Sequence, residues 1–267
     1  MRDLSEAARR QGELFGLGAR DWADEQERMA LPLWRAALQA AHVERGARLL
    51  DAGCGSGGAL LLAAELGAEV YGVDPSVNML TIARERLPTA DFRIGELENL
   101  PFPNAQFDAV IAINSLQFTP NPKLGAHELG RVCRKGGRIV VAVPGPLEQT
   151  DGRVIFEAMV KLFPKPPSPG PGVFALSPPG VLESVLESVD DIRVDQIHSI
   201  EAVMIHADMN HALRGALSSG PSQRAIEIHG RDKVTEAVRE ALHPFVQRDG
   251  SVRLRNTFRY AVARKMA

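Results

Sequence analysis

Short apolar runs alternate with helical stretches from Ala47 onward, and this alternation constrains the fold of the 267-residue chain more than any other feature. Brief apolar runs between turn signals are typical of buried strands. When such strands alternate with helices, the chain builds a Rossmann-like α/β fold, a mostly parallel sheet with helices on both faces. The runs and helical stretches, in order, are ARLLDAG, SGGALLLAAELG, AEVYGVD, SVNMLTIARERL, DFRIGEL, FDAVIAINS and, after a further helix, GRIVVAVPG.

The remaining segments predict helices, one irregular stretch and two late strands. The apolar spacing over residues 21–42 predicts a helix with one buried face, which Pro32 starts or bends. Proline and glycine are concentrated in residues 164–180, which we expect to form a loop near the ligand face. The other predicted elements are a short helix at 151–163, the helix VLESVLESV, the strand IRVDQIHSIEAV, two or three helices over 206–243, and a last strand VRLRNTFRYAVARK.

The composition narrows the classes of partner. Lys and Arg total 31 against 33 Asp and Glu, and no long basic run is present, so a nucleic-acid partner is disfavoured. Cys54 and Cys133 lack the paired spacing of a zinc site or a disulfide framework, so we expect two reduced thiols and no metal. The charged N-terminus has no apolar leader core, and no window reaches the roughly 18 apolar residues of a membrane span. We expect one cytoplasmic α/β domain with insertions, as a monomer or homodimer, without a membrane partner.

A glycine-rich turn, LLDAGCGSGG at residues 49–58, follows the first apolar run. Glycines there let the backbone approach a ligand closely. Gly53, Gly55 and Gly58 match the dinucleotide fingerprint, with Asp74 as the ribose-binding acid, so the pattern alone allows NAD. Asp51 argues against NAD because a carboxylate at the mouth of this loop would repel a pyrophosphate. It would attract the cationic amino-acid end of S-adenosylmethionine instead.

Four motifs in order resemble the class I S-adenosylmethionine-dependent methyltransferases, specifically the small-molecule group often called type 11. They are LLDAGCGSG at 49–57, VYGVDPSVNML at 70–80, GELENLPFPNAQFDAVIAINSLQF at 95–118 and HELGRVCRKGGRIV at 127–140. The resemblance is densest from Arg48 to Gly137 and generic beyond residue 145. It implies a seven-stranded sheet whose last strand runs antiparallel between the fifth and sixth, a place that the C-terminal run can fill.

The resemblance also implies roles for residues around the cofactor. Asp74 would hold the ribose hydroxyls, and Asp51 would be directed toward the amino group, directly or through water. Glu96, where most relatives carry aspartate, would accept from the adenine amino group, and the Leu97 amide would donate to the ring. Met79 would pack on adenine, or be plain core. The full set placed at the cofactor is Asp51, Gly53, Cys54, Gly55, Gly57, Asp74, Pro75, Met79, Glu96, Leu97, Asn114 and Ser115.

The same resemblance divides the methyltransferase domain into parts. These are a helical cap at 1–42, a cofactor-binding core at 43–146, a variable acceptor-side segment at 147–180, and a last helix and strands at 181–267 with a helical insert at 203–250. The acceptor pocket would be built by residues 15–42, 146–180 and 203–250.

Few residues are identified on the acceptor side. Gln117 and Phe118 would face the acceptor, and Trp22 would close over the cofactor or else cover the core. His206 and His211, close to Asp208 and Arg214 in a predicted helical stretch, could include a general base, or could lie on an exposed helical face. Apolar residues around Phe174 suggest a partly hydrophobic small molecule.

Three functions stay open at this stage. The favoured one is in-line transfer of the sulfonium methyl group to an oxygen, nitrogen or carbon of a small-molecule acceptor, which depends mainly on alignment and exclusion of water. The second is a protein that binds S-adenosylmethionine without transferring its methyl group, as a cyclase-like scaffold or a regulatory binder. The third, a nicotinamide-dependent oxidoreductase, is suggested only by the glycine spacing.

Overall fold

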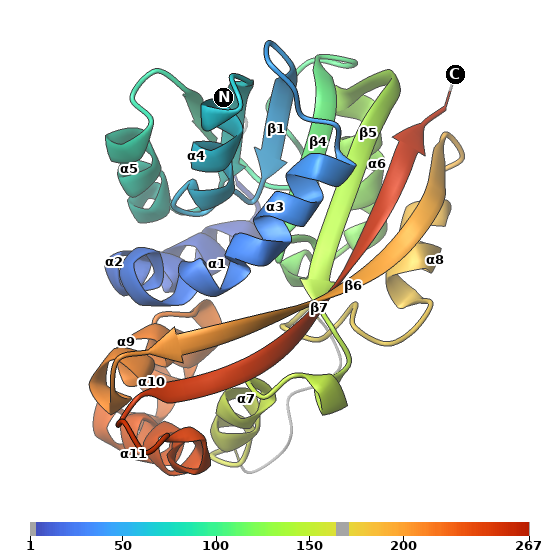
Figure 1. Ribbon diagram of the computed structural model, residues 1–267. Helices are drawn as coiled ribbons and strands as arrows, with labels where there is room; N and C mark the ends of the chain where they lie inside the picture. The colour runs from blue at the N-terminus through green and yellow to red at the C-terminus, as the bar shows by residue number, and fades with distance from the viewer. Residues whose placement is uncertain (1–3, 164–170, 267) are drawn as a thin grey trace.

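The computed structural model describes residues 4–163 and 171–266, and its centre is a seven-stranded sheet (Figure 1). The strand order is β3-β2-β1-β4-β5-β7-β6, and β7 pairs antiparallel with both of its neighbours. This order confirms the predicted sheet, including the antiparallel last strand between the fifth and sixth. The strands are β1 Arg48–Ala52, β2 Glu69–Asp74, β3 Asp91–Ile94, β4 Phe107–Ile113, β5 Cys133–Pro144, β6 Ile192–His206 and β7 Val252–Lys265.

Helices cover both faces of this sheet because its strands alternate the direction of their apolar side chains. Leu49 and Ile111 pack against α3, α4 and α5 on one face, whereas Leu50 and Val110 pack against α6 and α8 on the other. The helices are α1 Glu6–Leu17, α2 Ala19–Asp21, α3 Leu31–Ala40, α4 Gly58–Glu65, α5 Val77–Arg86, α6 Pro122–Val132, α7 Arg153–Val160, α8 Val181–Glu187, α9 Met209–Leu217, α10 Gly220–His229 and α11 Arg231–Leu242.

The strands β6 and β7 are 15 and 14 residues long and continue past the parallel strands as a two-stranded ribbon (Figure 1). Helices α9 and α11 pack on the far half of this ribbon, together with Met159 of α7. The sequence predicted that the sixth strand ends at Val203, but pairing with β7 continues to His206. The helical insert therefore starts after His206, because the alternating burial of residues 202–206 belongs to a strand rather than to a helix.

The N-terminal cap differs from the single helix predicted over residues 21–42. A π-helical turn, Trp22–Gln26, and a 3-10 turn, Glu27–Ala30, precede α3. Pro32 lies in the first turn of α3, where its missing N–H is not needed. Proline thus starts the third helix, and the tighter and wider turns before it let the cap bend over the sheet edge.

The proline-rich stretch is described only in part, because residues 164–170 lie outside the described residues. Residues 171–180 form turns without a helix or strand, as predicted. Among residues 4–163 and 171–266, no helix is both long enough and apolar enough to cross a membrane.

Candidate functional site

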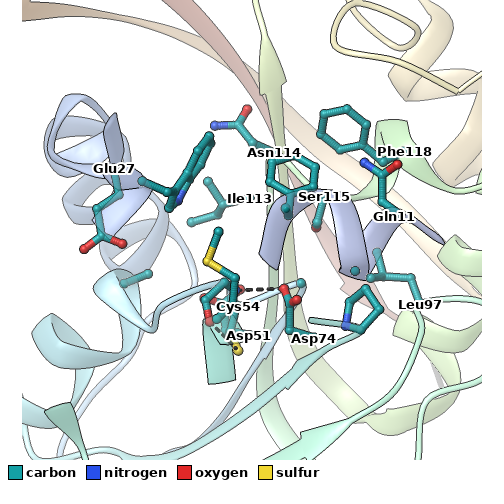
Figure 2. Close-up of a pocket in the computed structure, with 18 of the residues that line it drawn as sticks. Gln11, Glu27, Asp51, Cys54, Asp74, Leu97, Ile113, Asn114, Ser115 and Phe118 are labelled. Carbon is teal, nitrogen blue, oxygen red and sulfur yellow. Dashed lines mark hydrogen bonds between the residues drawn. The ribbon is translucent and has the colours of Figure 1, made fainter. Parts of the chain in front are cut away.

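Two adjoining clefts open where the parallel strands end, which is the edge of α/β sheets at which ligands bind. The first, here called the carboxylate cleft, encloses about 1170 Å³ including its open mouth. Its wall combines the loops after β1, β2, β3 and β4 with the N-terminal cap (Figure 2). Its acidic residues, which define its name, are Glu27, Asp51, Asp74, Glu96 and Glu98.

The glycine-rich turn has the close packing that its sequence predicts. Gly53 has φ +82°, and a Cβ there would lie 2.3 Å from the Cβ of Ser115, so a side chain is excluded twice over. Gly55 has φ +53°, and a Cβ there would meet no atom within 4 Å, so its backbone borders open cleft. The Gly55 N–H donates to Asp74 Oδ2 at 2.9 Å, which links the turn after β1 to the end of β2.

Asp74 and Asp51 form the floor of the carboxylate cleft (Figure 2). Asp74 accepts from the N–H groups of Gly55 and Ser76, yet burial raises its pKa to about 6. Asp51 is 4% exposed, and its Oδ1 has no hydrogen-bond partner. Burial, together with the charge of Asp74, raises the pKa of Asp51 to about 8. The raised pKa values of both carboxyls show that neither is close enough to a positive charge to offset its burial.

No such cation comes from the cleft itself. Among its lining residues, all within the described part of the chain, there is no Lys, Arg or His beside the five acids. A cationic ligand would relieve the burial cost of these carboxyls, whereas a phosphate would add to their repulsion. The cleft is therefore electrostatically suited to a cation with hydroxyl or amino donors.

Three contacts hold the N-terminal cap against this cleft. Glu96 accepts from the Ser5 N–H at 3.3 Å and from the Ser5 hydroxyl. In α1, Gly12 packs so closely that a Cβ would lie 2.4 Å from the Pro75 carbonyl oxygen. The third contact joins Glu27 of the cap to Ser56 of the glycine-rich turn.

Glu27 is a buried carboxylate that joins the cap to the glycine-rich turn. It accepts from the Ser56 hydroxyl and pairs with Arg86, whose guanidinium also donates to the Ser56 carbonyl at 3.1 Å and the Ala23 carbonyl at 3.3 Å. Burial raises the pKa of Glu27 despite these partners. This network couples the position of the cap to the shape of the turn.

The second cleft, here called the apolar cleft, encloses about 860 Å³ including its mouth. Phe15, Trp22 and Phe118 line both clefts, with ring centroids 5.6 Å apart for Phe15 and Trp22 and 5.5 Å for Phe15 and Phe118. Its described lining residues come from the cap, the turn after β4, residues 144–159 and 173–174, residues 204–221 and β7. Some of them lie in the segments 15–42, 146–180 and 203–250 that the sequence predicted for an acceptor pocket, whereas the residues after β4 and in β7 do not. Its large apolar residues are Phe15, Met29, Phe118, Ile155, Phe156, Met159, Phe174, Met204 and Phe258.

Most residues predicted at a site do line these clefts. Those on the carboxylate cleft are Asp51, Gly53, Cys54, Gly55, Asp74, Pro75, Met79, Glu96, Leu97, Asn114 and Ser115. Gly57 is not among them: it caps α4 at φ +83°, and a Cβ there would lie 3.2 Å from the Cβ of Ala83. Gln117 lines the apolar cleft, and Trp22 and Phe118 line both.

The two histidines proposed as bases line neither cleft. His206 is the last residue of β6, 3% exposed, and burial lowers its pKa. His211 is partly exposed on α9, where its Nδ1 is 2.9 Å from Asp208 Oδ1, and this hydrogen bond raises its pKa. Asp208 caps α9 by accepting from the His211 N–H, so this pair serves the helix end.

Several lining residues were not found from the sequence. They are Gln11, Phe15, Gln26, Glu27, Trp34 and Glu98. All but Glu98 belong to the cap, whose approach to the cleft depends on contacts distant in sequence. Glu98 lies in the motif at residues 95–118, and its position two residues after Glu96 could have indicated that it lies near the same cleft.

Comparison with known proteins identifies the family of this domain. Residues 50–141 match a family model described as a methyltransferase domain. A demethylmenaquinone methyltransferase of Tropheryma whipplei is 32% identical over 166 residues, which cover 61% of this chain and 67% of the relative. A phosphatidylethanolamine N-methyltransferase of Cereibacter sphaeroides is 39% identical over 109 residues, covering 38% of this chain and 53% of the relative.

Solved structures share the fold at low sequence identity. The YcgJ protein from Bacillus subtilis superimposes with a TM-score of 0.56 at 16% identity, covering 88% of this chain and 98% of that one. The [4+2]-cyclase SpnF gives 0.57 at 19% identity, covering 88% and 80%.

The sheet order, the glycine-rich turn and the matched domain model together define a methyltransferase domain. The chain belongs to the class I S-adenosylmethionine-dependent methyltransferases. It spans about half the length, 47%, of the first curated relatives that it matches, three mycobacterial proteins.

Proposed function

We propose that this chain transfers a methyl group from S-adenosylmethionine to a small-molecule acceptor, with the cofactor in the carboxylate cleft and the acceptor in the apolar cleft. The observation that carries the proposal is the contrast between the adjoining clefts. One holds five acids and no basic side chain, and the other holds no ionisable side chain among its described lining residues. A cation and an apolar partner would thus meet at a shared aromatic wall.

The fit to the cofactor follows from the unsatisfied acids. Asp74 would accept from the ribose hydroxyls with the lone pairs that Gly55 and Ser76 leave free. Asp51, whose Oδ1 has no partner, would pair with the amino group. Gly53 and Gly55 would border the methionine part through their backbone.

At the adenine end, Glu96 would accept from the amino group, beside the Leu97 N–H and Met79. Glu96 already accepts from Ser5, so this contact shares the carboxylate with the N-terminal cap. A ligand group that binds Glu96 would therefore compete with Ser5 for the carboxylate, and would affect how the cap is held against the cleft.

S-adenosylmethionine, when bound, supplies a methyl group already activated by its sulfonium. The protein's part is to align the acceptor and exclude water, which is where most of the rate gain arises in such a transfer. Phe15, Trp22 and Phe118 would exclude water at the junction, and their ring faces suit a nearby cation. Neither His206 nor His211 lies where it could take a proton from an acceptor in the apolar cleft.

A second function, binding of S-adenosylmethionine without transfer, is favoured by one observation. An apolar cleft without an ionisable side chain also suits a scaffold that only holds a reactant, and the [4+2]-cyclase SpnF has a similar fold. A nicotinamide oxidoreductase is opposed by the five acids, since no basic side chain of the described cleft would meet a pyrophosphate.

Methyl-labelled S-adenosylmethionine separates the two remaining functions. The purified protein is incubated with the labelled cofactor and a panel of apolar hydroxyl, amine and carbon acceptors, and labelled product and released S-adenosylhomocysteine are measured. Stoichiometric appearance of both supports transfer. Consumption of an acceptor without S-adenosylhomocysteine would contradict transfer and favour the scaffold.

A further inference from the structure

Among the residues that the structure describes, none that lines the apolar cleft could act as a general base. None of its described lining residues is Asp, Glu, His, Lys, Arg, Cys or Tyr. Among the charged groups on the elements packed around it, Arg259 of β7 pairs with Glu183, Arg153 of α7 pairs with Glu157 at 3.3 Å, and His211 of α9 pairs with Asp208. The acids of the carboxylate cleft face the neighbouring space. An acceptor in the apolar cleft must therefore be reactive without a protein base.

Three side-chain amides that line the apolar cleft, those of Gln26, Asn114 and Gln117, have a buried oxygen without a hydrogen-bond partner, and the last two follow β4. Gln117, which follows β4, is 2% exposed, lines the apolar cleft and has an Oε1 without a hydrogen-bond partner. Asn114 lines both clefts, and its Oδ1 is also buried without a partner. A buried amide oxygen without a partner has lost its hydrogen bonds to water without compensation, and a ligand's hydrogen-bond donor would restore one. The cleft thus favours an apolar molecule with a donor at one end.

We propose that the acceptor is a neutral, largely apolar phenol or enol, and that Gln117 and Asn114 select it by hydrogen-bonding its hydroxyl. The inference rests on the proposed function and names its substrate class. No described lining residue of the apolar cleft is charged, so a carboxylate or an alkylammonium would enter it without a protein group of opposite charge in contact, and would incur a burial cost that a neutral phenol avoids.

The balance of charge also favours this class. The phenol enters neutral and ionises beside the sulfonium, which pairs with the anion, while the proton leaves to water at the open mouth of the cleft; its oxygen, or a conjugated carbon, then forms a bond to the methyl carbon with its own electron pair. The pair of the breaking C–S bond stays on sulfur, so a cation and an anion become two neutral products. Methylation of a neutral amine would instead leave a cation in an apolar cleft, which low polarity disfavours.

Calorimetric titration of the S-adenosylhomocysteine-bound protein with three probes of one shape tests the charge preference. The probes are 1-naphthol, 1-naphthoate and 1-naphthylmethylamine, which are neutral, anionic and cationic at neutral pH. We expect 1-naphthol to bind at least about tenfold more tightly than either charged probe. Equal or tighter binding of a charged probe, or binding of none, would overturn the proposal. Binding of S-adenosylhomocysteine in the same sample separates this failure from failure of the proposed function.

A matched pair of variants tests the role of the amide. Gln117→Leu should weaken 1-naphthol binding by about tenfold and leave the affinity for S-adenosylhomocysteine unchanged. Gln106→Leu is the control, because Gln106 also has a buried unpartnered Oε1 but precedes β4 and lines neither cleft. Equal 1-naphthol affinity in wild type and Gln117→Leu would remove Gln117 from recognition, and the cofactor titration reports that each variant is folded.

Two naphthols of different acidity test the missing base. Without a protein base, the midpoint of the pH profile for methyl transfer should follow the acceptor, and should lie lower for 4-nitro-1-naphthol than for 1-naphthol. Groups of the protein contribute equally to both profiles and cancel in the comparison. Identical midpoints, or transfer to neither naphthol by a protein that binds both, would overturn the assignment.

Discussion

The two clefts share an aromatic wall but differ in charge: one is lined by five acids and the other by no ionisable side chain among the described residues. The carboxylate cleft buries Asp51 and Asp74 without a basic side chain among its described lining residues, which is costly when the cleft is empty and favourable when a cation binds. The apolar cleft buries almost no charge, so it selects by shape and by a few amide groups. The charge of the carboxylate cleft restricts its ligand to a cation, whereas the apolar lining of the second cleft is compatible with a broader class of ligands.

The two clefts also differ in the parts of the chain that form their walls. The carboxylate cleft is formed by strand ends and a glycine-rich turn that hydrogen bonds hold to the core. The apolar cleft is formed by the cap, the ribbon of β6 and β7, and loops between distant parts of the chain. The cap also lines the carboxylate cleft, so the ribbon and the loops are what distinguish the wall of the apolar cleft.

The largest expected effect is the loss of cofactor affinity when Asp74, on the floor of the carboxylate cleft, is replaced. Asp74→Ala should reduce the affinity for S-adenosylhomocysteine by about 100-fold or more, because two charge-assisted hydrogen bonds to the ribose are lost. Calorimetry measures the change. Asp91→Ala, at the start of β3 and outside both clefts, is the control that should bind normally. Retained affinity in Asp74→Ala would move the ribose site elsewhere.

A smaller effect is expected from the second acid. Asp51→Asn keeps the shape but removes the charge, so S-adenosylhomocysteine binding should weaken by about tenfold. In calorimetry, an unchanged dissociation constant would show that Asp51 does not meet the amino group.

The same two acids predict how stability depends on pH. Burial raises the folded-state pKa of Asp51 to about 8 and of Asp74 to about 6, both above the unfolded value. Their contribution is fully present below the unfolded pKa and is lost as pH rises through these folded values. The free energy of unfolding without ligand should therefore fall by several kcal/mol between about pH 4 and about pH 8, at ~1.4 kcal/mol per pH unit for each acid that is protonated only in the folded state.

Chemical denaturation at a series of pH values measures this fall. Asp51→Asn should flatten its upper part, because the group that titrates near pH 8 is gone. A fall of equal size in the variant would assign the titration to other groups.

The smallest effect is expected outside both clefts. His211→Ala should change transfer by less than about twofold and leave the thermal unfolding midpoint nearly unchanged, because the contact it loses with Asp208 is exposed to solvent. Steady-state rates and thermal unfolding test this. A large loss of transfer with normal folding would restore His211 as a base and contradict the placement of the acceptor.

The fold was predictable because local patterns carry it. Alternating runs predicted all seven strands, and Gly53 and Asp74 lie where strand ends and a tight turn require them. The cap was predicted less well, since the π-helical turn at Trp22–Gln26 and the burial of Glu27 depend on Arg86 and on the distant turn after β1. His206 was misplaced because apolar spacing near a strand end does not distinguish a long strand from the start of a helix.

The central claim, that the carboxylate cleft is built for a cation without phosphate, is tested most directly by calorimetric titration with S-adenosylhomocysteine beside NADH. S-adenosylhomocysteine keeps the amino group and ribose of the cofactor, so we predict micromolar binding of it and no binding of NADH. Binding of NADH, or binding of neither ligand by a folded sample, would contradict the claim.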